Sequence, residues 1–176
     1  MSDIERLMTE AGFADYRWTS GADLVAGQWV RLKCTYACQS YGRQACCPPN
    51  VPSVAVSREF FREYERVAVI HIEKAGDSPQ KLDLWKREVN TTLLELERAV
   101  FLAGFYKAMV LFPGDCSLCP QCVPEPEDCR HPGSVRPTPE ALGVDVFATA
   151  RKLGYPIEVL TDYDQAMNRY AFLLIE

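Results

Sequence analysis

Eight cysteines fall into two tight groups, and their side chains are the residues of this chain best suited to chemistry. The first group is Cys34, Cys38, Cys46 and Cys47, and the second is Cys116, Cys119, Cys122 and Cys129. Scattered cysteines are typical of buried structural thiols, whereas dense groups are typical of metal ligands. Thiolates are soft ligands that both iron–sulfur clusters and zinc accept. The grouping therefore predicts two metal sites, or one site that both groups share.

The second group has the spacing of a cluster-binding loop. Cys116, Cys119 and Cys122 follow one another at intervals of three residues, and Cys129 follows seven residues later. Runs that begin C-x2-C-x2-C hold iron–sulfur clusters, because such a loop can fold three sulfur atoms around one inorganic centre. We expect a [4Fe–4S] cluster on these four cysteines, with Cys129 able to serve either site. Zinc is the alternative metal, although structural zinc usually takes two C-x2-C pairs that are far apart in sequence.

The first group lies in a pattern that resembles a known family. Lys33-Cys34-x3-Cys38 is followed by Tyr41-Gly42 and then by Cys47-Pro48-Pro49. This combination resembles a prokaryotic family of predicted metal-binding proteins, domain of unknown function 2284. The stretches around the second group that agree with the same family are 112–114, 129–132, 136–137 and 140–146. The resemblance spans nearly the whole chain and implies metal or iron–sulfur binding, without implying a reaction.

In the family's pattern, the cysteine before the two prolines corresponds to Cys47. Cys46 is then a backup ligand or a buried apolar residue, and the resemblance leaves Cys34, Cys38 and Cys47 as ligands. A cubane on three thiolates has one open iron, and an open coordination position separates catalytic metal sites from closed structural ones. The alternative is that Cys46, Cys129 or a carboxylate closes the site and makes it an electron-transfer centre.

Composition and charge restrict the class of protein. With 176 residues, of which 48% are hydrophobic, the chain is long enough for one domain over residues 1–176 with its own core. The N-terminus has no secretory layout and no apolar stretch has membrane length, so we expect a cytoplasmic protein without a membrane partner. The cytosol keeps thiols reduced, which favours metal ligands over disulfides. A net charge of −5 without long basic runs argues against a nucleic-acid partner.

The hydrophobic pattern indicates the elements that position these cysteines. It predicts helices over 3–11, from Ser53 or Ser57 to Glu65, over 82–104 and over 138–153. It predicts strands over 29–32, 67–72, 107–112, 157–160 and 170–175. The acidic residues of the long helix, Glu97 among them, are expected on a solvated face.

Strand 67–72, helix 82–104 and strand 107–112 form a β-α-β unit that is long enough for a right-handed parallel crossover. The second cysteine group follows directly after the second of these strands, where open α/β sheets bind ligands. We therefore expect an α/β fold: a small mixed sheet with a β-α-β unit, helices packed on it, and two cysteine-rich metal-binding loops.

Three functions fit these residues. The first is an iron–sulfur protein with two [4Fe–4S] sites that transfers electrons or assists a redox partner protein. The second is an enzyme that activates a small substrate at an open-iron cluster on Cys34, Cys38 and Cys47, beside the cations of Arg31 and Lys33. The third is a zinc-stabilised interaction module without redox chemistry. The sequence has no nucleotide-binding or protease motif.

Overall fold

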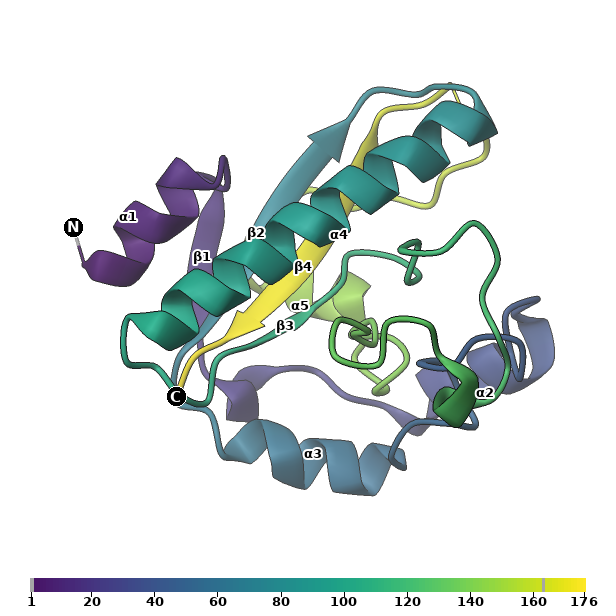
Figure 1. Cartoon of the computed structure of the whole chain (residues 1–176), viewed down its shortest axis with the longest axis horizontal. Coiled ribbons are helices and arrows are strands. Elements are labelled where there is room, and N and C mark those ends of the chain that lie inside the picture. Colours follow the sequence, from purple (N-terminus) through teal and green to yellow (C-terminus); the bar gives the residue numbers. More distant parts are fainter. Residues whose placement is uncertain (1, 163) are drawn as a thin grey trace.

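Four strands form one sheet in the order β1-β2-β4-β3 in the computed structural model, which describes residues 2–162 and 164–176 (Figure 1). The strands are β1 (Tyr16–Thr19), β2 (Val67–Lys74), β3 (Met109–Leu111) and β4 (Met167–Leu174). Each pair is antiparallel, and the longest pair, β2 with β4, extends from Val67 opposite Leu174 to Lys74 opposite Met167.

The helices are α1 (Asp3–Glu10), α2 (Gln28–Ala37), α3 (Val54–Arg62), α4 (Pro79–Leu102) and α5 (Val146–Lys152), with short 3-10 turns η1 (Gly21–Asp23) and η2 (Pro126–Asp128). Side chains cap several of these helices. Ser2 and Glu5 form a capping box at the start of α1. The Ser53 hydroxyl accepts a hydrogen bond from the Val56 backbone N–H, at 3.3 Å. Helix α3 therefore starts after Ser53, the first of the two serines predicted to begin it.

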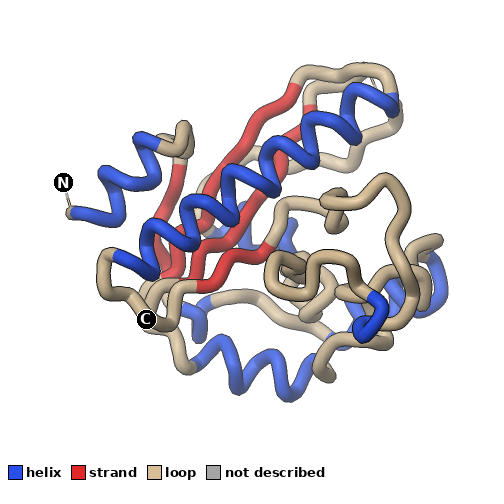
Figure 2. Tube along the Cα trace, in the orientation of Figure 1, coloured by secondary structure: helices blue, strands red, loops and turns tan. Residues whose placement is uncertain are grey.

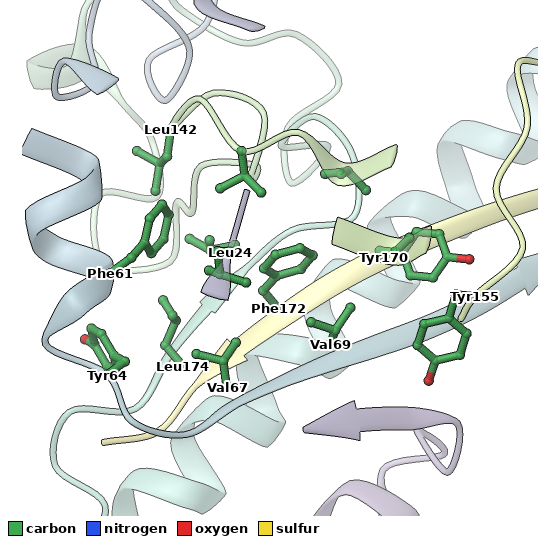
Figure 3. Packing of buried hydrophobic residues seen from close by; sticks show 14 of the residues in the cluster. Leu24, Phe61, Tyr64, Val67, Val69, Leu142, Tyr155, Tyr170, Phe172 and Leu174 are labelled. Carbon is green, nitrogen blue, oxygen red and sulfur yellow. The ribbon is translucent and has the colours of Figure 1, made fainter. Parts of the chain in front are cut away.

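The sheet buries both of its faces, because alternate residues of a strand point to opposite sides. On one face, Ile70 of β2 and Leu173 of β4 pack with residues of α1 and α4 such as Leu93. On the other face, Val69 and Phe172 pack with residues of α3, α5 and the segment before α5 (Figure 3). Fully burying one such side chain contributes about 2 kcal/mol. The sheet is therefore a stable platform for the cysteine-rich segments that extend from it.

The α/β class, the β-α-β unit and the two cysteine-rich segments are confirmed, but the sheet is not the mixed one that the sequence predicts. β2 and β3, the strands that flank α4, run in the same direction because each is antiparallel to β4, which lies between them. The β-α-β unit is therefore a split one: its two strands are parallel, but β4 separates them, so that β2 and β3 are not hydrogen-bonded to each other. β4 takes the central position because Tyr170–Leu174 is an uninterrupted buried run that suits a strand covered on both faces.

Two predicted strands are wrong and one strand was not predicted. Residues 29–32 belong to α2, where Val30 alone is buried, so that the apolar residues around it lie on an exposed helical face. Residues 157–160 form no strand. β1 was missed because none of its four residues is buried and they carry little apolar pattern.

The helix predicted over 138–153 is shorter than expected. Gly143 has a φ of 86°, a left-handed conformation that interrupts a helix. The Asp145 side chain then accepts a hydrogen bond from the Ala148 backbone N–H at 2.9 Å, so α5 begins only at Val146. No helix among the described residues is long and apolar enough to cross a membrane.

Candidate metal centre

The two cysteine-rich segments lie side by side, on the side of the sheet toward which β3 leads (Figures 1 and 2). The first consists of α2 and the turns that follow it, and the second is the long loop after β3. The Asn50 side-chain amide donates a hydrogen bond to the Pro124 carbonyl at 2.6 Å, and that of Gln44 donates to the Asp115 carboxylate at 3.4 Å. These contacts bring together two groups of cysteines that are far apart in sequence.

Three cysteines of the first group line one cavity of about 220 Å³: Cys34, Cys38 and Cys47. Cys34 and Cys38 are four residues apart at the end of α2, a spacing that places both on one side of a helix. Gly42, with a φ of 64°, lets the chain turn back, and its N–H donates to the Pro48 carbonyl at 2.9 Å. This turn returns Cys47 to the other two thiols.

Burial, followed by the neighbouring Cys38 and Cys47, raises the pKa of the Cys34 thiol. Both causes disfavour a thiolate, because a charge is costly away from water and near other negative charges. The three thiols of this cavity are therefore held close enough to repel one another when ionised. A bound cation would remove that repulsion.

Cys46 connects the two groups, although the sequence indicated no certain role for it. It is 7% exposed, and its thiol lies beside the sulfur atoms of Cys116 and Cys47. These contacts raise the pKa of Cys46, which keeps its proton and donates it. The hydrogen bond from Cys46 lowers the pKa of Cys47, and it lowers that of Cys116 to about 7. A sequence shows only that Cys46 and Cys47 are adjacent; the contact with Cys116 requires the fold.

The remaining cysteines of the second group, Cys119, Cys122 and Cys129, are partly buried in the loop after β3. The Cys122 thiol contacts the Val123 carbonyl at 3.6 Å. Cys129 follows the 3-10 turn η2. The structure thus brings Cys116 to the first group, and the four-cysteine set of the second group stays a prediction.

The donor set fits a metal that prefers sulfur, but the ligands are not yet arranged around one point. Across residues 2–162 and 164–176, no three histidine, cysteine, aspartate or glutamate side chains are placed to hold a metal ion. Soft thiolates suit zinc and iron–sulfur clusters, whereas magnesium and calcium prefer oxygen ligands. Metal binding would have to remove the protons of the ligand thiols and draw the thiolates inward.

Helix α4 holds the start of the second cysteine-rich segment in place. The Asp115 carboxylate accepts a hydrogen bond from Lys86 at 3.2 Å, and its backbone carbonyl accepts one from the Asn90 amide at 3.3 Å. The Arg87 guanidinium donates to the Ser117 carbonyl at 3.0 Å. The position of Cys116 is therefore set by polar residues of α4, which hold the residues directly before and after it in the chain. Sequence reasoning missed these residues because polar positions of a helix usually face water.

Glu97 of α4 likewise holds the end of this segment, and the prediction that it lies on a solvated face is wrong. Its carboxylate pairs with the Arg136 guanidinium at 2.6 Å and accepts a hydrogen bond from the Val110 N–H at 2.6 Å. The Glu97 side chain is 13% exposed and that of Arg136 is 20% exposed. The pair is bidentate, with two hydrogen bonds, and it fixes the position of Arg136 relative to α4 because the planar guanidinium matches a carboxylate.

Glu140 and Arg169 lie where several cavities meet. Glu140 lines the cavity of Cys34, Cys38 and Cys47 and two cavities beside it. Its carboxyl is open to the cavities but has protein on most sides, and the resulting loss of hydration raises its pKa. Arg169 lines the same three-cysteine cavity and also a larger one of about 750 Å³. The thiol site therefore has neighbouring space for a ligand.

Comparison with known proteins identifies the family. No curated protein and no solved structure matches the chain. The family model described as "Predicted metal-binding protein (DUF2284)" matches residues 17–175, a range that contains both cysteine groups. This match confirms the resemblance seen in the cysteine spacing, and the chain belongs to this family of predicted metal-binding proteins, domain of unknown function 2284.

Proposed function

We propose that this protein binds two adjacent [4Fe–4S] clusters and acts in electron transfer or as a redox accessory protein. Cys34, Cys38 and Cys47 are the proposed ligands of the first cluster. Cys116, Cys119, Cys122 and Cys129 are the proposed ligands of the second. The observation that supports this proposal most is the cavity that Cys34, Cys38 and Cys47 line together, with Cys46 beside it as the neighbour of both Cys47 and Cys116 of the second group.

The residues of the chain would tune such a centre in a definite way. When bound, a [4Fe–4S] cluster supplies one-electron redox chemistry. The backbone N–H groups of Leu118 and Arg136 donate hydrogen bonds to the Cys116 sulfur and favour its thiolate. Hydrogen bonds to ligand sulfur atoms raise the reduction potential of a cluster. Cys46 remains beside two ligands as a hydrogen-bond donor.

The test is the content of iron, zinc and acid-labile sulfide in protein purified without oxygen, together with its visible spectrum. Two clusters require about eight irons and eight sulfides per chain. Cys34→Ser and Cys119→Ser should each retain about four irons, because each removes a ligand of one cluster only. Cys46→Ala is the matched control and should retain the full content. Zinc without sulfide would contradict the proposal and leave a zinc-stabilised interaction module.

A second candidate is an enzyme that activates a small substrate at the cluster on Cys34, Cys38 and Cys47. One observation favours it: the cavity lined by these three thiols shares Pro113 and Arg169 with a larger cavity, so a ligand has space beside it. The test uses the Cys119→Ser variant, which is designed to keep this cluster alone. Addition of a small thiol should change the electron paramagnetic resonance spectrum of the reduced protein. An unchanged spectrum, with a protein ligand on each iron, would exclude this candidate.

A further inference from the structure

A second kind of cavity lies outside the cysteine groups. It has a volume of about 750 Å³ and lies between the first half of α4, the turn at 113–115, the segment 160–162 and the start of β4. Small-molecule sites are concave and largely apolar, and they typically have volumes of about 300–1,000 Å³. The cavity is therefore large enough for an organic molecule rather than for a metal ion alone.

Much of the wall is apolar. The side chains that provide this surface are Leu82, Trp85, Val89, Leu160 and Met167. Trp85 offers a broad aromatic surface at low cost in side-chain entropy, because its ring has only two rotatable bonds. A ligand with a flat apolar body would cover this surface and exclude water from it.

Two cations line the cavity, but only one of them is available. Lys86 is held by the carboxylates of Asp83 at 2.8 Å and Asp115 at 3.2 Å. Among the described residues Arg169 has no ion pair within 4 Å, although the Glu140 carboxylate lies within electrostatic reach, and its guanidinium contacts the Met167 sulfur at 3.6 Å. A guanidinium has five N–H donors, and a thioether is a weak acceptor. Arg169 therefore has donors free for a ligand.

We propose that this cavity binds a small organic carboxylate with an apolar body, and that Arg169 holds the carboxylate through paired hydrogen bonds. The planar guanidinium matches a carboxylate in geometry. A monoanion fits better than a phosphate dianion, because Arg169 also attracts the Glu140 carboxylate and because Asp83, Asp115 and Asp162 are already in the wall. The apolar body packs on Trp85.

The site is placed so that its ligand lies next to the cysteines. Pro113, Gly114, Asp115 and Arg169 line both this cavity and the one that contains Cys34, Cys38 and Cys47. A carboxylate on Arg169 therefore sits at the boundary of the two. Recognition by Arg169 and Trp85 does not depend on which metal the thiols bind, so the inference goes beyond the proposed metal centre.

The test is calorimetric titration of the protein, purified without oxygen and with its metal retained, with benzoate and with benzamide. These probes share a ring and differ in charge. Benzoate should bind at least tenfold more tightly than benzamide. Arg169→Gln should remove this difference, and Arg169→Lys should retain only part of it because a lysine lacks the planar fork. Arg62→Gln, on the exposed side of α3, is the matched control and should bind benzoate like the natural protein.

Equal binding of the two probes, or no binding of either, would overturn the proposal. Tight benzoate binding that survives in Arg169→Gln would also overturn it. If Arg169→Gln does not fold, Leu160→Trp takes its place, since it fills the cavity from a residue that is 37% exposed. The Leu160→Trp variant should weaken benzoate binding at least tenfold. Metal content is measured on the same samples, so failure of the metal proposal and failure of this one are separate results.

Discussion

At the scale of single residues, burial and neighbouring thiols set how readily each cysteine loses its proton. Hydrogen bonding with Cys46 lowers the pKa of Cys116 to about 7, while burial raises the pKa of Cys34. The thiolate is the form of cysteine that reacts with alkylating agents and binds metals. Two thiols with similar partial exposure should therefore differ in reactivity at neutral pH.

In the metal-free protein, iodoacetamide should modify Cys116 with a half-maximal rate near pH 7, roughly tenfold faster than Cys34 at that pH. The measurement is mass-spectrometric mapping of modified peptides as a function of pH. Cys46→Ala removes the hydrogen-bond donor and should move the midpoint of Cys116 to higher pH. A midpoint that stays near 7 in this variant would mean that the backbone N–H groups alone stabilise the thiolate.

A second effect at this scale concerns the carboxylate of Asp15, which lies just before β1 in the chain. The Asp15 carboxylate accepts hydrogen bonds from the His71 ring at 2.7 Å and from the Tyr155 hydroxyl at 2.9 Å. Partial burial alone would raise the pKa of Asp15, but the two hydrogen bonds outweigh it and lower the pKa. A carboxyl whose pKa is lower in the folded state stabilises the fold above its unfolded pKa of about 3.9. That stability is lost as the pH falls through the folded pKa.

The Tm of the protein should therefore fall as the pH drops from about 5 to 3, and Asp15→Asn should lose less over the same range. Asp15 is 59% exposed, so solvent screening limits the effect. We expect a difference of about 0.5 kcal/mol, or roughly 1–2 °C in Tm. Scanning calorimetry at several pH values measures it. Parallel Tm curves for the two proteins would show that Asp15 has no part in acid stability.

At the scale of elements, α4 positions the second cysteine-rich segment from both ends. Glu97 pairs with Arg136 where the segment returns to the sheet, and both side chains are mostly buried. Removing one partner leaves the other charge buried without compensation. The consequence is a loss both of stability and of loop order.

Glu97→Ala should lower the free energy of unfolding by about 3 kcal/mol. Urea denaturation measures this change. Glu95→Ala is the matched control, because Glu95 is exposed on the same helix, and it should change the free energy by less than about 0.5 kcal/mol. Equal effects of the two substitutions would show that the ion pair with Arg136 contributes little.

The elements also show where a local sequence pattern is sufficient to predict a helix or a strand. Helix α4 and strands β2 and β4 were predicted because their long apolar patterns reflect burial in the two clusters on the sheet. Residues 29–32 of helix α2 were predicted to be a strand because the side chains of this helix are mostly exposed, so no apolar period marks it. A pattern predicts an element only where that element buries a face.

At the scale of the whole molecule, the core and the cysteine-rich segments are built from different residues. The two apolar clusters are formed by the sheet and its helices, and Cys116 packs only at the edge of one of them. The cysteine-rich segments lie in the other part of the molecule, where loops predominate (Figure 2). Regions with few apolar contacts open with little cost in free energy.

Metal removal should therefore loosen the cysteine-rich segments and leave the sheet folded. The metal-free protein should keep most of its far-UV circular dichroism, while trypsin cleavage after Arg130 accelerates roughly tenfold. Arg98, on α4, is the internal control and should stay protected. Loss of the whole far-UV signal on metal removal would show instead that the metal is required for folding.

The sequence by itself determined the α/β class, the main helix and strands, and the family, because each depends on residues that are near one another in the chain. The spacing within each cysteine group is likewise a property of residues that are close together in the chain. Only the tertiary structure decided that β4 lies between β2 and β3. It also decided that Cys46 contacts Cys116 and that Arg169 faces the cavity beside the thiols. These features join residues that are distant in the chain, and pairing and packing of the whole fold, rather than local preference, determine which distant residues meet.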